Sequence, residues 1–264
     1  MVDRQEEGMK MSGDIKVHIE TGVALVSIAN PPVNAISRQM LTRITEVFDS
    51  LHHHPGANVA ILAGTGDRAF CAGADLKDTS EDAWRTADHG RSMRTALESI
   101  YECAIPVIAA VNGPALGGGL ALVAACDYAI ASERATFGLP EIDMGVLGGA
   151  RHAARLFPIN AVRRMHYSAI RIDAMEAYRL GAVLRVVPHS RLMAEAMGEA
   201  AMLAAKMPRG LRLAKENLNA IEWMDLKNGY RFEQTRTDLL CQTRDAVEAR
   251  AAYLERRPPV FIGE

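Results

Sequence analysis

The sequence has almost no excess charge and no long apolar run. Thirty Lys and Arg residues against thirty-two Asp and Glu residues leave a formal charge of −2, which provides no bulk attraction for nucleic acid or a membrane surface. No uninterrupted apolar stretch approaches the roughly 18 residues that a membrane-spanning helix requires. Any site for an anion must therefore be local.

Disulfide and metal motifs are also missing. The four cysteines, Cys71, Cys103, Cys126 and Cys241, form neither a CxxC pair nor a metal-ligand spacing, and free thiols in a reducing cytoplasm fit this pattern. Residues 1–13 are polar and charged and have no apolar region of the kind that a signal peptide needs. We expect a flexible N-terminal leader on a soluble, cytoplasmic protein.

The chain has 264 residues, of which 49% are hydrophobic, enough for one large domain or a domain with an appended subdomain. Two β-rich runs, Ile15–Ile19 and Val23–Ile28, flank Glu20-Thr21-Gly22 and predict a hairpin. Apolar residues then recur at intervals of three and four from Ser37 to Leu51, which predicts an amphipathic helix with Ser37 as its N-cap.

Strands and helices alternate in the next part of the chain. We expect strands at Val59–Leu62, Val107–Val111 and Tyr128–Ala131, with helices at Arg91–Cys103 and Leu120–Cys126. This alternation predicts an α/β architecture in which both faces of the sheet are covered.

The chain after Phe157 is predicted to be mostly helical, with Ala182–Val187 as the only further strand. The expected helices are Asn160–Ser168, Asp173–Leu180, Ser190–Lys206, Pro208–Trp223 and Leu226–Glu255. No low-complexity linker separates them from the rest, so we expect a helical C-terminal extension rather than an independent domain.

A glycine triplet, Gly117-Gly118-Gly119, follows the strand Val107–Val111 and precedes the helix Leu120–Cys126. Glycines let a ligand approach the main chain closely, and the first turn of a helix has N–H groups with no partner inside the helix. Its positive end favours a negatively charged ligand. The same triplet is also typical of a tight turn with close strand–helix packing, so its context decides.

That context resembles the enoyl-CoA hydratase/isomerase (crotonase) family. The segments that carry the resemblance are AFCAGADLK at 69–77, NGPALGGG at 112–119 and ATFGLPEIDMG at 135–145, together with PPVNA at 31–35 and RRPPVF at 256–261. Several motifs in the correct order make an accidental match improbable. The resemblance covers nearly the whole chain.

The resemblance implies a ClpP/crotonase-like spiral of β-β-α units over residues 14–195, after the leader at 1–13. It implies that the helical region 196–264 packs between subunits in a trimer or a dimer of trimers. It also implies an acyl-CoA thioester as substrate, with coenzyme A as part of that substrate and no metal or redox cofactor.

In members of the family two main-chain N–H groups hold the thioester oxygen, and the matching positions are Ala74 and Gly118. Fixed N–H donors stabilise the negative charge that develops on this oxygen without having to reorganise. Hydratases of the family also use two glutamates. The second is matched by Glu141, which an apolar pocket would keep protonated toward neutral pH, and the first is matched by Ala121.

Ala121 leaves several reactions open, because a methyl group can neither hold water nor transfer a proton. Hydration of a 2-enoyl-CoA is the expected reaction, with Glu141 alone or with a recruited group. Relatives that shift a double bond, and relatives that hydrate and then cleave hydroxycinnamoyl-CoA, resemble this pattern of a single glutamate. Further alternatives are hydrolysis of a thioester or C–C bond, decarboxylation, and a non-catalytic acyl-CoA-binding protein.

Other residues are assigned to the site or its walls. His152, in the segment Gly149–Ala154, is a candidate second acid–base group or a packed residue, and Asp143 is assigned a structural role. Arg68 and Lys77 are candidates for the phosphates of coenzyme A. Further candidates for substrate contact are Ala72, Asp75, Leu76, Gly117, Ala121 and Gly149.

Two groups of apolar residues are expected around the acyl chain. Residues Thr79–Glu98 are predicted to shape the pocket, with Trp84, Met93 and Leu97 making it apolar. Trp223, Tyr230 and Phe232 are predicted to close it from the C-terminal region, or else to form an interface core.

Overall fold

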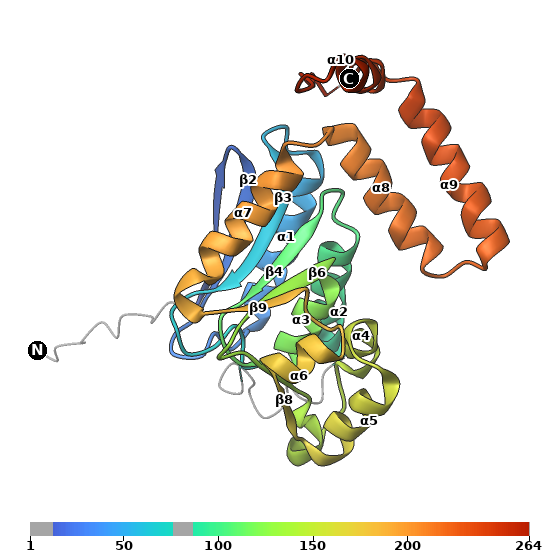
Figure 1. The fold of residues 1–264 in the computed structure, drawn as a ribbon. Helices are drawn as coiled ribbons and strands as arrows, with labels where there is room; N and C mark the ends of the chain where they lie inside the picture. The colour runs from blue at the N-terminus through green and yellow to red at the C-terminus, as the bar shows by residue number, and fades with distance from the viewer. Residues whose placement is uncertain (1–12, 76–86, 264) are drawn as a thin grey trace, which may run out of the picture.

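The computed structural model describes residues 13–75 and 87–263, and its centre is a six-stranded sheet (Figure 1). The strand order is β1-β2-β3-β4-β6-β9. The strands are β1 (Asp14–Glu20), β2 (Gly22–Ala29), β3 (Ala57–Gly64), β4 (Val107–Val111), β6 (Tyr128–Ser132) and β9 (Arg185–Val187). β1 and β2 form the predicted antiparallel hairpin, and the remaining neighbours pair in parallel.

A second, three-stranded sheet has the order β5-β7-β8. It consists of β5 (Ala115–Leu116), β7 (Thr136–Gly138) and β8 (Arg171–Asp173). β5 directly follows β4 in the chain and leads into the glycine triplet. The small sheet therefore fixes the position of the turn that enters the next helix.

Helices cover both faces of the large sheet, as the sequence predicts. α1 (Arg38–His53), α2 (Ala87–Tyr101) and α3 (Gly118–Ala125) share one apolar core, and α7 (Leu192–Ala204) packs on the opposite face (Figure 1). β3 shows why both faces are dry: Ala60 and Leu62 enter the first core, while Val59 and Ile61 enter the second. Side chains of a strand alternate between faces, so a strand buried on both sides reads as a continuous apolar run.

Local signals explain where the helices begin. Ser37 is the N-cap of α1, and its hydroxyl accepts a hydrogen bond from the N–H of Met40 at 3.2 Å. Asp173 caps α6 (Ala174–Arg179) in the same way by accepting from Glu176. The amphipathic spacing of α1 is confirmed, since its apolar residues from Met40 to Leu51 are buried.

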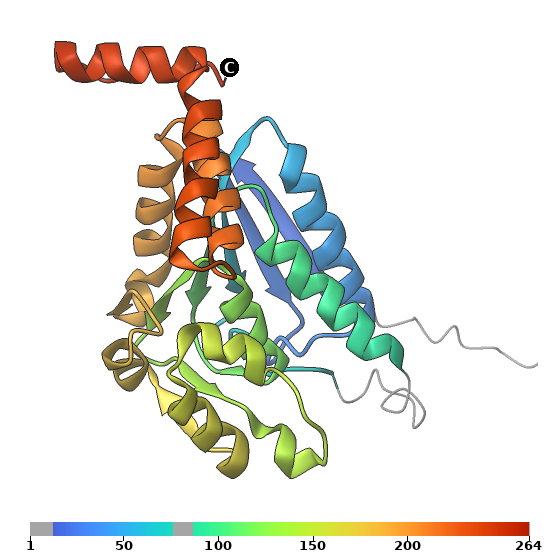
Figure 2. The same ribbon diagram turned by 90° about the vertical axis from the view of Figure 1, so that its right-hand side faces the viewer.

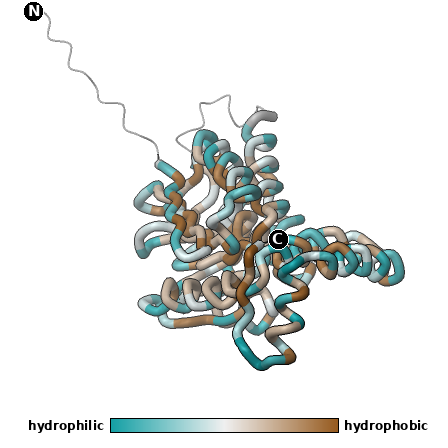
Figure 3. Tube along the Cα trace, turned by 90° about the horizontal axis from the view of Figure 1, so that it is seen from above, coloured by the Kyte–Doolittle hydropathy of each residue, from teal (hydrophilic) through white to brown (hydrophobic). Residues whose placement is uncertain are grey.

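The remaining elements follow the glycine turn and the second sheet. They are η2 (Pro140–Met144), α4 (Ala150–Leu156), α5 (Ile159–Ser168), η3 (His189–Arg191), α8 (Pro208–Ile221), α9 (Leu226–Cys241) and α10 (Arg244–Glu255). α8 and α9 lie side by side, and α10 extends away from them and from the sheet (Figure 2). Viewed from above, these C-terminal helices project beyond the body and alternate between polar and apolar residues (Figure 3).

Three expectations differ from the structure. β8 is a further strand after Phe157, so Ala182–Val187 is not the only one. The expected helix Leu226–Glu255 is two helices, because Thr243 caps a new one by accepting from the N–H of Ala246. α7 runs through the expected domain boundary at 195/196 and packs on β2, β3, β4 and β6, so the helices that leave the core begin with α8.

The cysteines are free thiols, and Cys71, Cys103 and Cys126 are buried. Burial raises the pKa of the Cys71 thiol to about 12, which keeps it protonated and unreactive. No helix in the described part of the chain has the length and apolar character to cross a membrane. The predicted leader at 1–13 lies outside the described residues except for Gly13.

Candidate active site

The glycine turn opens a helix that has no polar face. Gly117 is the N-cap of α3 with a φ of 54°, a left-handed conformation that glycine adopts without strain. Gly118 is the first residue of α3, and Gly119 to Ala125 are all buried. The free N–H groups of the first turn, with the positive end of the helix, therefore lie at the edge of a dry core.

The loop that carries Ala74 packs against this turn. A Cβ placed on Gly73 would lie 3.8 Å from the N atom of Gly118, so the main chains are in close contact. Ile36 pairs with this loop by donating to the Gly73 carbonyl and accepting from the N–H of Asp75, both at 2.8 Å. This pairing bypasses the intervening N–H of Ala74. Among the residues that the structure describes, neither Ala74 nor Gly118 has an acceptor for its N–H.

The carboxyl of Glu141 lies beside the same glycines. A Cβ on Gly117 would be 2.7 Å from Oε1 of Glu141, and one on Gly148 or Gly149 would be 3.6 or 3.8 Å away. Glu141 is only 8% exposed. Its Oε2 is buried and has no hydrogen-bond partner within the described ranges. A side chain at position 117 would therefore overlap the carboxyl group, whereas a Cβ on Gly148 or Gly149 would lie at ordinary contact distance from it.

Burial raises the pKa of Glu141 above its ordinary value, while its own N–H and the charge of His166 lower it in part. Because desolvation disfavours the carboxylate, the group holds its proton at a pH where an exposed glutamate has lost it. A carboxyl group with a raised pKa is suited to act as a general acid as well as a general base.

An apolar wall covers the start of α3. The Cε of Met93, on α2, would lie 2.8 Å from a Cβ on Gly118, so this side chain covers the first turn. Leu97, one helical turn later, is buried. Both were predicted to border the acyl pocket, and the structure places Met93 beside the expected position of the thioester. Trp84, also predicted there, and residues 79–86 lie outside the described residues.

The structure provides no second carboxyl from α3. Ala121 is 1% exposed and belongs to the apolar core, as do its neighbours on the helix. Asp143, on η2, is exposed to solvent. Within the described part of the chain, Glu141 is thus the only carboxyl group that contacts the glycine turn.

His152 is not brought together with Glu141. It lines a cavity of about 120 Å³ between α2, α4 and the end of α8, with Leu97, Glu98, Tyr101, Arg151, Arg155 and Trp223. Burial, followed by the nearby charges of Arg155 and Arg151, lowers the pKa of His152, so its imidazole stays neutral. The segment Gly149–Ala154 therefore reaches the site through Gly149, whereas His152 faces another cavity.

The remaining candidates lie at different distances from the glycine turn. Arg68 is exposed, and Ala72 and Asp75 are half-buried in the loop on either side of Gly73 and Ala74. Leu76 and Lys77 lie outside the described residues. Since Arg68 precedes this loop, it stays a candidate for a phosphate group.

The C-terminal aromatics divide into two groups. Trp223 is mostly exposed, but its Nε1 donates to the hydroxyl of Tyr101 at 3.3 Å and its ring lies 4.6 Å from the guanidinium of Arg151. It therefore contacts the core. Tyr230 is exposed and Phe232 half-buried on α9, with Arg236 of the same helix over the Phe232 ring.

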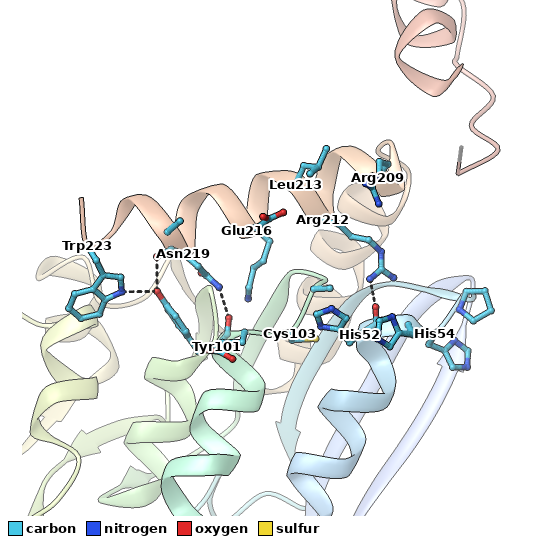
Figure 4. A pocket seen from close by; sticks show the side chains of 16 residues that line it. His52, His54, Tyr101, Cys103, Arg209, Arg212, Leu213, Glu216, Asn219 and Trp223 are labelled. Atoms are coloured by element: carbon cyan, nitrogen blue, oxygen red, sulfur yellow. Dashed lines mark hydrogen bonds between the residues drawn. The ribbon is translucent and has the colours of Figure 1, made fainter. Parts of the chain in front are cut away.

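A larger cavity, of about 840 Å³, lies between α8 and the ends of α1 and α2 (Figure 4). Its walls include His52, Tyr101, Arg212 and Asn219. Arg212 donates to the carbonyl of His52, and the Tyr101 hydroxyl donates to the carbonyl of Asn219 at 3.1 Å. Neither Glu141 nor the glycine turn lines this cavity. The carboxyl of Glu141 therefore lies outside this cavity.

Comparisons with known proteins show the family of this chain. A sequence model of the enoyl-CoA hydratase/isomerase family matches residues 18–264. The chain is 38% identical over 240 residues to a (7aS)-7a-methyl-1,5-dioxo-2,3,5,6,7,7a-hexahydro-1H-indene-carboxyl-CoA hydrolase of Rhodococcus jostii, covering 90% of this chain and 93% of the other. It is 35% identical over 245 residues to a carnitinyl-CoA dehydratase of Citrobacter koseri, with coverage of 90% and 94%.

A solved structure is also similar over almost the whole length. The crystal structure of an enoyl-CoA hydratase from Bacillus anthracis has a TM-score of 0.90 and 34% sequence identity, and the match covers 95% of this chain and 99% of that one.

Proposed function

The chain belongs to the enoyl-CoA hydratase/isomerase family, which acts on CoA thioesters, and from this premise we propose a reaction. The protein adds water to the C2–C3 bond of an acyl-CoA, or removes water from it. Glu141 is its only acid–base group. The observation that carries the proposal is the buried carboxyl of Glu141, held against Gly117 with Oε2 unpaired.

The N–H groups of Ala74 and Gly118 would bind the thioester oxygen. When water adds to C3 of an enoyl thioester, or when a proton leaves C2, negative charge develops on that oxygen as an enolate. Donors that are already oriented and free of other partners stabilise this charge without rearrangement, which in enzymes is worth about 10²- to 10³-fold per donor. The amino end of α3 adds its partial positive charge at the same place.

Glu141 would transfer one proton of the added water to C2, while the other proton stays in the new hydroxyl group on C3. In hydration the carboxylate accepts a proton from water as the oxygen bonds to C3, the electron pair of the double bond moves toward the thioester, and the carboxyl returns a proton to C2. Dehydration runs the same steps in reverse. One carboxyl group has two oxygens, so a single glutamate can serve both carbons if they lie on one face of the substrate. A single carboxyl group has to act at both carbons because Ala121 offers no second acid or base.

Two similar proteins support this reaction class. The Bacillus anthracis structure is named an enoyl-CoA hydratase and the Citrobacter koseri protein a carnitinyl-CoA dehydratase, and both names describe water addition or removal on a CoA thioester. Double-bond isomerisation would use the same carboxyl as a proton shuttle without water.

Hydrolysis is the second candidate, because the Rhodococcus jostii protein, at 38% identity, is named a CoA hydrolase of a ring-containing dione. The same groups would serve. Glu141 would deprotonate water for attack on a ketone β to the thioester, the C–C bond would break, and its electron pair would become the enolate held by Ala74 and Gly118. A proton delivered to carbon completes the step.

Products from a panel of 2-enoyl-, 3-enoyl-, 3-hydroxyacyl- and cyclic β-ketoacyl-CoA thioesters, incubated in ¹⁸O-labelled water, would separate these reactions by tandem mass spectrometry. Hydration places the label in a hydroxyl group, dehydration removes water, isomerisation keeps the mass, and ring hydrolysis places the label in a new carboxylate. Label only in carboxylate would replace the first candidate by the second.

The matched variants for this assay are Glu141→Gln and Asp143→Asn, which remove a buried and an exposed carboxylate two residues apart. We expect E141Q to lose about 10²- to 10⁴-fold in kcat/KM, the usual contribution of a general acid or base, and D143N to retain the wild-type value. Full activity of E141Q would remove Glu141 from the mechanism.

Assembly and CoA binding complete the proposal. Leu226, Tyr253 and Leu254 on the C-terminal helices are each at least 80% exposed, and a trimer or dimer of trimers would bury such side chains between copies. Light scattering of the purified chain tests this. No group other than coenzyme A would be needed for the reaction, with Arg68 and Lys77 as candidate phosphate contacts.

A further inference from the structure

Two buried polar atoms without hydrogen-bond partners belong to neighbouring elements. One is Oε2 of Glu141 on η2, and the other is Nδ1 of His166 on α5. α5 packs directly on η2. Buried polar atoms normally have partners because leaving one unpaired is costly, so two such atoms on elements that pack together call for a functional explanation.

A short segment links the surroundings of the two side chains. Gly149 borders the Glu141 carboxyl, and the next residue, Ala150, lines a cavity of about 270 Å³ between α4 and α5. His166 lines that cavity as well. His166 therefore lines the same cavity as the residue that follows Gly149, and Gly149 and Ala150 supply only small groups in this region.

Other charged groups near Glu141 do not compete with His166. Asp143, on the same element, is exposed, and α3 has no titratable side chain. Arg151 on α4 and Arg163 and Tyr167 on α5 line the cavity. The nearby charge of His166 opposes the effect of burial on the pKa of Glu141.

We propose that His166 is a positioning residue that controls whether Glu141 carries its proton. A protonated imidazole stabilises the nearby carboxylate and so favours the base form of Glu141, whereas a neutral imidazole leaves burial to dominate and favours the acid form. The inference rests on the proposed function, since it concerns the acid–base group assigned there. Neither atom needs a direct hydrogen bond for this coupling.

The variants are His166→Gln, which keeps polarity, and His166→Leu, which fills the space with an apolar group. In both, the Glu141 carboxyl should keep its proton to higher pH, and the midpoint of its titration should rise by about 1 pH unit, the lower end of what a neighbouring opposite charge produces. Tyr167→Phe, a change at the adjacent and exposed residue, should leave the midpoint unchanged.

Infrared titration of the folded protein without substrate measures this directly. The carboxyl band of Glu141 is identified by its loss in Glu141→Gln and is followed with pH in each variant. Titration midpoints equal to that of wild type in both His166 variants would overturn the proposal. A shifted midpoint in a protein that turns over no acyl-CoA would support the coupling and reject the proposed function.

Kinetics provides a second readout. In an active enzyme the pH profile of kcat/KM should move with the infrared midpoint, which a purely structural role of His166 would not produce.

Discussion

Oε1 of Glu141 fills the space where a side chain on Gly117 would begin, since a Cβ there would lie 2.7 Å from it. Gly117→Ala should therefore push the carboxyl away from the glycine turn. We expect a loss of about 100-fold or more in kcat/KM, because small displacements of a reacting group carry penalties of this size. Steady-state kinetics on the identified substrate measures it.

The matched control is Gly181→Ala. Gly181 also has a positive φ, of 78°, but a Cβ there would meet nothing within 4 Å. Both variants should lose stability because a side chain at positive φ is strained, and only G117A should lose activity. Equal activity losses would mean that backbone strain, not the Glu141 contact, explains the result.

Two adjacent glycines should respond very differently to the same change. A Cβ on Gly119 would lie 2.1 Å from the carbonyl oxygen of Cys71, which is main chain, whereas one on Gly118 would meet the end of the flexible Met93 side chain at 2.8 Å. We expect G119A to cost about 3 kcal/mol of unfolding free energy or more and G118A about 1 kcal/mol or less. Urea unfolding measures both. Equal costs would be inconsistent with the packing of α3 against the Cys71 loop.

The raised pKa of Glu141 has a consequence for stability. The folded state binds the proton more tightly than the unfolded state, so this group contributes stability below its unfolded pKa, and that contribution is lost as pH rises through the folded pKa. Glu141→Gln carries no charge at any pH. It should match wild type in acid and exceed it by about 1 kcal/mol at neutral pH, where the buried carboxylate lacks partners.

Thermal melts of E141Q across pH test this difference. Glu46→Gln, a change at an exposed carboxylate of α1, serves as the control and should show no comparable trend. A constant difference between E141Q and wild type at all pH values would rule out the ionisation as its cause.

Removing one or the other partner of the ion pair between Lys215 and Asp127 should have unequal costs in stability. The side chain of Lys215 is 4% exposed and that of Asp127 is 23% exposed. The ammonium of Lys215 lies 2.6 Å from Oδ2 of Asp127, and this oxygen also accepts a hydrogen bond from the N–H of Val107 at 2.6 Å. Asp127→Asn leaves a buried, unpaired cation and should cost about 3 kcal/mol. Lys215→Met leaves a carboxylate that keeps its main-chain donor and some contact with water, and should cost less.

Chemical denaturation of D127N and K215M gives the order of their free energies of unfolding. The exposed pair Arg43–Glu46 provides the comparison, and its removal by Glu46→Gln should cost at most about 0.5 kcal/mol. If K215M were the less stable of the first two variants, the packing of α8 on the core, and not charge, would dominate.

Much of the fold follows from local signals that the chain repeats. α1 could be predicted because its apolar spacing and Ser37 cap agree, and β4 because a run of five apolar residues is long enough for a buried strand. The crotonase fold, expected from ordered motifs, is confirmed by the structural match. β8 was missed because Arg171–Asp173 has one buried residue between two exposed ones and forms a strand only by pairing with β7. The break between α9 and α10 could not be predicted either, because the helical spacing continues across Gln242, where Thr243 caps a new helix.

The candidate site divides in the same way. Gly118 and Glu141 could be proposed from sequence because each belongs to a motif with neighbours that define it. His166 could not, since its relation to Glu141 depends on how α5 packs on η2, and nothing in the segment Ile159–Ser168 distinguishes this histidine from a surface residue. His152 shows the converse: it was close to the motif in sequence, but the side of α4 on which it lies turns it toward α2.

The burial of α3 has a consequence for ionic strength. Mobile ions cannot approach a helix whose side chains from Gly119 to Ala125 all lie in the core, so the field at its amino end is poorly screened. The proposed contacts between exposed residues such as Arg68 and the phosphates of a CoA ligand would have no such protection. Added potassium chloride should therefore raise KM while leaving kcat nearly constant, so that capture of the substrate and its chemical conversion respond separately to the same solvent.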